Sequence, residues 1–162
     1  MRSKLKVYDD FLNPEEYENV RKLMMDDNLM NWNFSDGINM PKDGKYQFCH
    51  IFYHQYQPRS EFWGGLTPII ERIDPSAIAR IKANLNMRTP EIEEYELHTD
   101  FDDAITSIYY VNTNNGYTRF EDGTKVDSIA NRMLVFDSNM KHAGTSCTDE
   151  LRRCLINFNY YV

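Results

Sequence analysis

The hydrophobic pattern changes along the chain from helical spacing to alternation. Residues 4–12 have the pattern of a short strand or entry segment. Asn13 then fits a helix N-cap, with Pro14 at the first helical position and acidic residues in the first turn. The apolar residues that follow recur at helical spacing, which predicts that they face the core: Tyr17, Val20, Leu23 and Met24.

A loop, a strand and a second helix are expected next. Turn-forming residues over 35–45 predict the loop, and alternation over 46–56 predicts a strand with His50 and His54 on one face. Two histidines at that spacing stand roughly 13 Å apart on a strand, so they cannot bind one metal together. We expect them to be packed or hydrogen-bonded. Residues 62–73 predict a helix that ends at Asp74 and Pro75.

Short strands with regular turn signals fill the rest of the chain. This order of helices followed by about eight strands predicts a mainly β fold, a jelly roll with N-terminal helices packed on one sheet. Without a linker or repeat, residues 1–162 are expected to form one domain. The expected strands are 77–87, 94–98, 104–112, 117–120, 124–126, 132–136, 141–144 and 152–162.

Composition narrows the class of protein. Hydrophobic residues make up 41% and charged residues 27%, as in soluble globular proteins. The formal net charge of −7 argues against nucleic acid as a partner. Three cysteines without a CxxC pair argue against a disulfide framework and fit a reducing compartment. With no apolar run long enough for a signal peptide or membrane helix, we expect a cytoplasmic protein with no membrane partner. The pattern does not reveal the oligomeric state.

The segment ELHTDFDD contains candidate metal ligands. On an extended strand His98 and Asp100 point to the same side, and His142 is the one histidine that follows them. Two histidines and a carboxylate leave three coordination positions open, as non-haem Fe(II) oxygen chemistry requires. An HxD tripeptide is also common by chance, in a strand that ends in an acidic turn. Asp102 and Asp103 are interpreted as such turn acids.

A cation follows the second histidine. A 2-oxo acid bound at such an iron carries a distal carboxylate, which arginine binds best because its planar fork can donate two parallel hydrogen bonds. Arg152 and Arg153 open the last strand. Alternation places Arg152 on a mostly apolar face suited to packing, and Arg153 on the polar face with Asn157 and Asn159. Arg153 is therefore the predicted carboxylate receptor.

Together these motifs resemble the iron(II)/2-oxoglutarate-dependent dioxygenases, in particular the prolyl 4-hydroxylase-like branch. The family pattern is HxD, a distal histidine and a basic residue some ten positions later. The resemblance extends to TSIYYVN, to RMLVFDSNMKHAG, to the opening VYDDFLNPEEYENV and to NGYTRFEDG, in which Asn115 replaces a family glycine. It is good over 77–162 and thin over 30–76.

The resemblance implies a double-stranded β-helix and a site within it. His98, Asp100 and His142 would hold Fe(II), with 2-oxoglutarate and O2 as cosubstrates. A C–H bond of a peptidyl, possibly prolyl, or small amino-acid-like substrate would be hydroxylated, with release of succinate and CO2. The small-molecule or peptide substrate is the expected partner. The resemblance also implies these contacts to 2-oxoglutarate: Arg153, Tyr110, Thr118, Tyr95 and Asn86.

Two other functions use the same residues. In a non-catalytic jelly-roll binding module, the acids of TDFDD would bind Ca²⁺ through oxygen ligands. In a zinc hydrolase, the three ligands would bind Zn²⁺ and an activated water. Both leave Arg153 without an anionic partner. Iron-dependent turnover of 2-oxoglutarate distinguishes the three functions.

Overall fold

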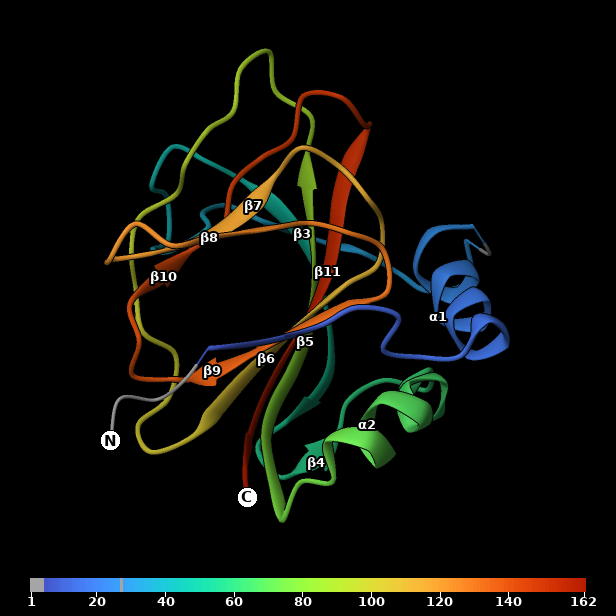
Figure 1. Cartoon of the computed structure of the whole chain (residues 1–162). Helices are drawn as coiled ribbons and strands as arrows, with labels where there is room; N and C mark the ends of the chain where they lie inside the picture. The colour runs from blue at the N-terminus through green and yellow to red at the C-terminus, as the bar shows by residue number, and fades with distance from the viewer. Residues whose placement is uncertain (1–4, 27) are drawn as a thin grey trace.

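Two antiparallel β-sheets pack face to face in the computed structural model, which describes residues 5–26 and 28–162 (Figure 1). The larger sheet has the strand order β1-β9-β6-β11-β5-β3-β2, and β4 pairs with β3. Its strands are β1 (Lys6–Tyr8), β2 (Asn33–Ser35), β3 (Gln47–His54), β4 (Gln57–Pro58), β5 (Ala77–Met87), β6 (Ile105–Tyr110), β9 (Arg132–Asp137) and β11 (Arg152–Tyr161). The smaller sheet has the order β10-β7-β8, formed by β7 (Tyr117–Phe120), β8 (Lys125–Asp127) and β10 (His142–Ala143).

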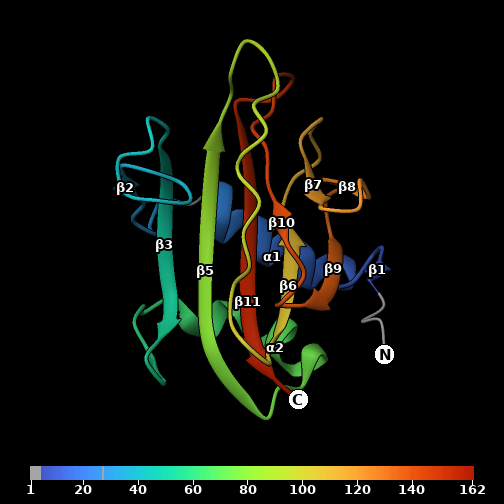
Figure 2. The ribbon, with the colours of Figure 1, turned by 90° about the vertical axis from the view of Figure 1, so that its left-hand side faces the viewer.

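The helices cover one face of the larger sheet (Figure 2). They are α1 (Pro14–Met25), the short 3-10 helix η1 (Trp63–Leu66) and α2 (Thr67–Ile73). The predicted N-cap is present, because Asn13 Oδ1 accepts a hydrogen bond from the Glu16 amide at 2.9 Å. Asp74 ends α2 in the left-handed conformation, with φ of 44°. Both predicted helices are therefore confirmed.

Alternate side chains of β5 and β11 point to opposite faces of the larger sheet, one toward the helices and the other toward the smaller sheet. Ile81, Ala83, Cys154, Ile156 and Phe158 are buried against the helices. The intervening residues on both strands face the smaller sheet, and Arg153 is among them. This confirms the predicted faces of the last strand and the predicted jelly roll with helices on one sheet.

The predicted strands differ from the observed ones in three respects. Residues 94–98 form no strand but two isolated bridges, Glu94 to Thr145 and His98 to His142. Three residues lie between the bridges on one side and two on the other, so a single regular ladder cannot join them. The structure also has the short edge strands β2 and β4, which the sequence pattern did not predict. A register shift between Ile51 and Tyr53 interrupts the predicted alternation of 46–56.

The expectation for His50 is met. His50 is buried and fully hydrogen-bonded, with Nδ1 2.7 Å from the Asn31 carbonyl oxygen and Nε2 2.7 Å from Ser60 Oγ. The three cysteines are free buried thiols. No described helix is long and apolar enough to cross a membrane. Residue 4 of the predicted N-terminal segment lies outside the described residues.

Candidate metal centre

The isolated bridge between His98 and His142 sets the separation of the two imidazoles. Each residue's amide donates to the other's carbonyl oxygen at 2.9 Å, and the ring centroids lie 4.5 Å apart. His142 Nδ1 donates to the Met140 carbonyl at 3.0 Å, and His98 Nδ1 to that of Glu96 at 3.3 Å. Because Nδ1 carries the proton in both rings, both Nε2 atoms are free to bind a metal.

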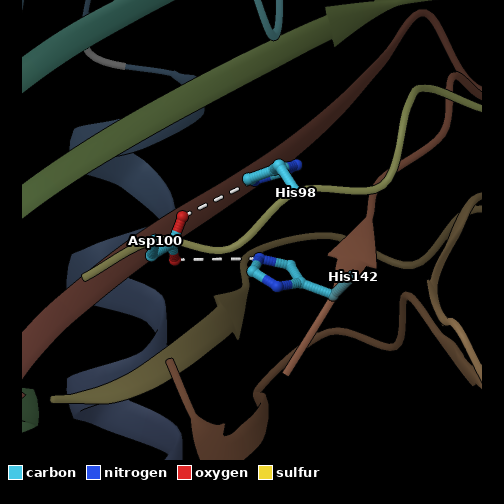
Figure 3. Close-up of side chains that lie close together, drawn as sticks. All are labelled: His98, Asp100 and His142. Carbon is cyan, nitrogen blue, oxygen red and sulfur yellow. Dashed lines mark ion pairs between the residues drawn. The ribbon is translucent and has the colours of Figure 1, made fainter. Parts of the chain in front are cut away.

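Asp100 completes the group from the irregular segment that follows His98 (Figure 3). Its carboxylate oxygens lie 3.5 Å from His98 Nε2 and 3.7 Å from His142 Nε2. Oδ2 accepts hydrogen bonds from Thr106 Oγ1 and Asn159 Nδ2, both at 3.0 Å. One potential ligand atom from each of the three side chains lies within 4.8 Å of the others, which is close enough to hold one metal ion.

The charge states of Asp100 and His142 suit a cation. Burial raises the pKa of Asp100, but the neighbouring His98, His142 and Arg80 outweigh that effect and hold the pKa well below its usual range. Burial lowers the pKa of His142. At neutral pH the site therefore offers an anionic carboxylate and a neutral imidazole, which are the metal-binding forms.

Arg153 lies in the same cavity, which has a volume of about 300 Å³. The side chain is only 1% exposed. Its guanidinium donates to Ser128 Oγ at 2.8 Å, to Asn86 Oδ1 at 3.3 Å and to Thr118 Oγ1 at 3.3 Å. These neutral acceptors fix the orientation of the guanidinium and leave its charge uncompensated.

No carboxylate among residues 5–26 and 28–162 forms an ion pair with Arg153. Burial lowers the pKa of this guanidinium, although arginine remains charged in proteins. A buried charge without a partner is costly, so an anionic ligand is the chemical complement of this end of the cavity. Two glycines make room for the side chain, since a Cβ at Gly116 would lie 2.6 Å from Arg153 Cδ and one at Gly144 would lie 3.2 Å from its NH1 atom.

The structure brings most of the predicted site residues together. Asn86, Thr118 and Tyr95 line the cavity with Arg153 and the three candidate metal ligands. Tyr110 lies next to these residues. It is fully buried beside the guanidinium, 5.7 Å from its ring centroid to Arg153 Cζ, and its hydroxyl donates to Thr118 Oγ1 at 2.7 Å. Its side chain therefore supports the site from behind the cavity wall.

Asn157 was predicted from the sequence to share the face of Arg153, whereas several other polar residues of the site were not predicted. Gln47, Lys82, Asn84 and Asn157 also line the cavity. Lys82 and Asn84 on β5 and Asn157 on β11 face the cavity by the same alternation that places Arg153 there. That alternation was the available signal, but the pairing of the two strands is needed to bring these side chains to one wall.

Comparisons with known proteins agree on the fold. No protein-family model and no curated protein matches the sequence significantly. Among solved structures, a Trichoplax adhaerens prolyl hydroxylase in complex with a hypoxia-inducible-factor peptide fragment matches with a TM-score of 0.68 and 14% identity, over 97% of this chain and 83% of that chain. A Pseudomonas putida prolyl-4-hydroxylase matches with a TM-score of 0.61 and 14% identity, over 99% of this chain and 94% of that chain. The chain has the prolyl hydroxylase fold.

A third solved structure, which is not described as a prolyl hydroxylase, has the same fold. HygX from Streptomyces hygroscopicus, solved with nickel and 2-oxoglutarate bound, matches with a TM-score of 0.65 and 9% identity, over 98% of this chain and 83% of that chain. At such identities the likeness establishes the fold alone. The prolyl hydroxylase fold also includes residues 30–76, in which the sequence resemblance is thin, because the matches span nearly the whole chain.

Proposed function

We propose that this chain is an Fe(II)- and 2-oxoglutarate-dependent oxygenase that hydroxylates a C–H bond of a peptidyl or small amino-acid-like substrate. One observation carries the proposal. A buried guanidinium without an acidic partner lies in the same cavity as two imidazoles and a carboxylate grouped within 4.8 Å. A metal at one end of a cavity and an unpaired cation at the other fit a ligand with two anionic ends.

In this proposal His98, Asp100 and His142 hold the iron. Two imidazoles and one carboxylate prefer iron to calcium, which takes oxygen ligands only. Thr106 and Asn159 keep the carboxylate oriented through their hydrogen bonds to Oδ2. Bound iron and 2-oxoglutarate supply the oxidising chemistry, in which O2 is consumed and succinate and CO2 are released.

Arg153 receives the distal carboxylate of 2-oxoglutarate. Its fork donates charge-assisted hydrogen bonds from a buried position on the cavity wall. Asn86 and Thr118 hold the guanidinium at the cavity wall, and Tyr95 lines the same space. Tyr110 holds Thr118 in turn. These residues bind and orient the cosubstrate.

The alternatives account for fewer of these residues. A calcium-binding module leaves the imidazoles and Arg153 without a role. A zinc hydrolase uses the three ligands but gives the buried guanidinium no anion. The molecules bound in the similar structures support a peptide or small-molecule substrate, since one prolyl hydroxylase is in complex with a peptide fragment and HygX has been solved with hygromycin B bound.

The test is metal-dependent turnover of 2-oxoglutarate. Purified protein should bind one Fe(II) per chain and convert 2-oxoglutarate to succinate, and His98→Ala or His142→Ala should weaken metal binding by roughly 100-fold or more, beyond the effect of changing an outer hydrogen-bond partner. His54→Ala is the matched control, because His54 lies on β3 and does not line the cavity. Thermal melts verify folding of each variant. Full metal affinity in both ligand variants would contradict the assignment.

A further inference from the structure

Lys82 lies on the inner wall of the cavity without an acidic partner. It is on β5, two residues from Arg80 and two from Asn84, and all three line the cavity. No carboxylate in the described part of the chain forms an ion pair with Lys82. Arg80 differs, because it is 3.8 Å from Asp100 Oδ1 and donates to Asn159 Oδ1 at 3.1 Å. Lys82 is therefore the free cation near the metal end.

The cavity is positive although the chain is negative. Its charged lining residues are the cations Arg80, Lys82 and Arg153 and the single carboxylate Asp100, while the whole chain has a formal net charge of −7. Fe(II) and doubly charged 2-oxoglutarate cancel each other, so the loaded cavity stays positive. Positive charge concentrated in a cleft attracts and holds anions.

An unsatisfied acceptor lies across from this cation. Asn157 on β11 pairs in register with Lys82 on β5, and it lines the same cavity. Its Oδ1 atom is buried and has no hydrogen-bond partner among the described residues. Buried polar atoms are nearly always paired, and rotation of the Asn157 amide would turn this oxygen toward an N–H donor supplied by a ligand. A cation and a free acceptor on adjacent strands match a carboxylate beside an N–H group.

We propose that the substrate is an amino-acid carboxylate, either a free amino acid or the C-terminal residue of a peptide, with the carboxylate bound by Lys82 and the adjacent nitrogen donating to Asn157 Oδ1. This inference rests on the proposed function and names the substrate of that site. A cavity of about 300 Å³ that also holds 2-oxoglutarate has room for one amino-acid residue but not for a peptide that runs through it.

Matched acids and amides test the proposal. The probes are free amino acids and their amides, and tripeptides with a free or an amidated C-terminus. Dissociation constants are measured on protein loaded with Mn(II), with and without 2-oxoglutarate, and succinate release is followed with Fe(II) and O2. For at least one pair the acid should bind roughly 10-fold or more tightly than its amide, as expected of a charge-assisted contact. The pair that shows the preference identifies the source, free amino acid or peptide terminus.

Substitutions of Lys82 test whether this residue causes the preference for acids over amides. Lys82→Met should reduce the acid-over-amide ratio to about 2-fold or less and leave the dissociation constant of 2-oxoglutarate unchanged, whereas Lys82→Arg should retain most of the ratio. Lys22→Met is the control, since Lys22 is exposed on α1. Equal affinities for every acid and amide, or a Lys82→Met variant that loses 2-oxoglutarate instead of the acid, would overturn the inference. Failure of the wild-type protein to bind 2-oxoglutarate would contradict the proposed function itself, and this outcome is distinct from a failure of the inference about Lys82.

Discussion

Gly116→Ala tests whether the position of Arg153 is set by its neighbours. A Cβ at residue 116 would lie 2.6 Å from Arg153 Cδ, 2.7 Å from the Ser146 carbonyl oxygen and 2.8 Å from Asn114 Oδ1. Ordinary contacts begin near 3.4 Å, so neighbouring atoms must move by several tenths of an ångström or more. Ser146 cannot yield easily, because its amide and hydroxyl are both bonded to the segment at Glu93. The guanidinium of Arg153 is expected to shift instead.

Two measurements should change together. Overpacking of this kind costs about 1–3 kcal/mol, which corresponds to a decrease in Tm of roughly 2–12 °C for a chain of this size. A displaced guanidinium loses part of its paired hydrogen bonding, so the dissociation constant of 2-oxoglutarate should rise roughly 10- to 100-fold. Calorimetric titration with 2-oxoglutarate at saturating Mn(II) and a thermal melt measure the two effects.

The matched control is Gly64→Ala, since a Cβ there would meet no atom within 4 Å. It should leave the affinity for 2-oxoglutarate unchanged. If Gly116→Ala also binds 2-oxoglutarate with wild-type affinity, then Arg153 tolerates displacement, and the argument that its fixed position determines cosubstrate binding is refuted.

Two further predictions concern the same cavity. Arg153→Ala should weaken 2-oxoglutarate binding by about 2–5 kcal/mol, which is tens- to thousands-fold, whereas Arg152→Ala, whose side chain bonds the Met25 carbonyl outside the cavity at 2.8 Å, should change it by less than about 1 kcal/mol. The reverse ranking would show that Arg152 is the receptor. Metal affinity should decrease as pH falls below neutrality. Burial lowers the pKa of His98, but Asp100 outweighs this and raises it, so a proton competes with the metal at Nε2. A Mn(II) affinity that stays constant from pH 8 to pH 5.5 would contradict this.

Local signals in the sequence were sufficient for most elements. Asn13 and Pro14 specify the start of α1, and the alternation of 77–87 specifies the full length of β5. The edge strands β2 and β4 were missed because two or three residues carry no periodicity. The segment 94–98 was predicted as a strand because it alternates, but its partner is offset by one residue between the two bridges. Such an offset depends on tertiary pairing.

At the candidate site too, local signals predicted some residues, whereas others depend on tertiary pairing. His98, Asp100 and His142 were predictable from residue type and spacing, and the structure groups them. The roles of Lys82 and Asn157 were not predictable, because each depends on the register between β5 and β11, which the sequence pattern does not specify. Tyr110 makes a contact with Thr118 that was not predictable, for a related reason. Its strand was predicted, but its position behind Thr118 depends on how the two sheets pack.

The reciprocal hydrogen bonds between His98 and His142 have a consequence for how this site can be altered. They join the peptide groups of two segments, so the spacing of the two positions depends on neither the imidazoles nor a bound ion. Any residue except proline can maintain this pairing, because every other residue has both an amide hydrogen and a carbonyl oxygen. The side chains at positions 98 and 142 can therefore be replaced without loss of the backbone pairing that sets their spacing. Engineering could install a different set of metal-binding side chains there while the surrounding backbone keeps its shape.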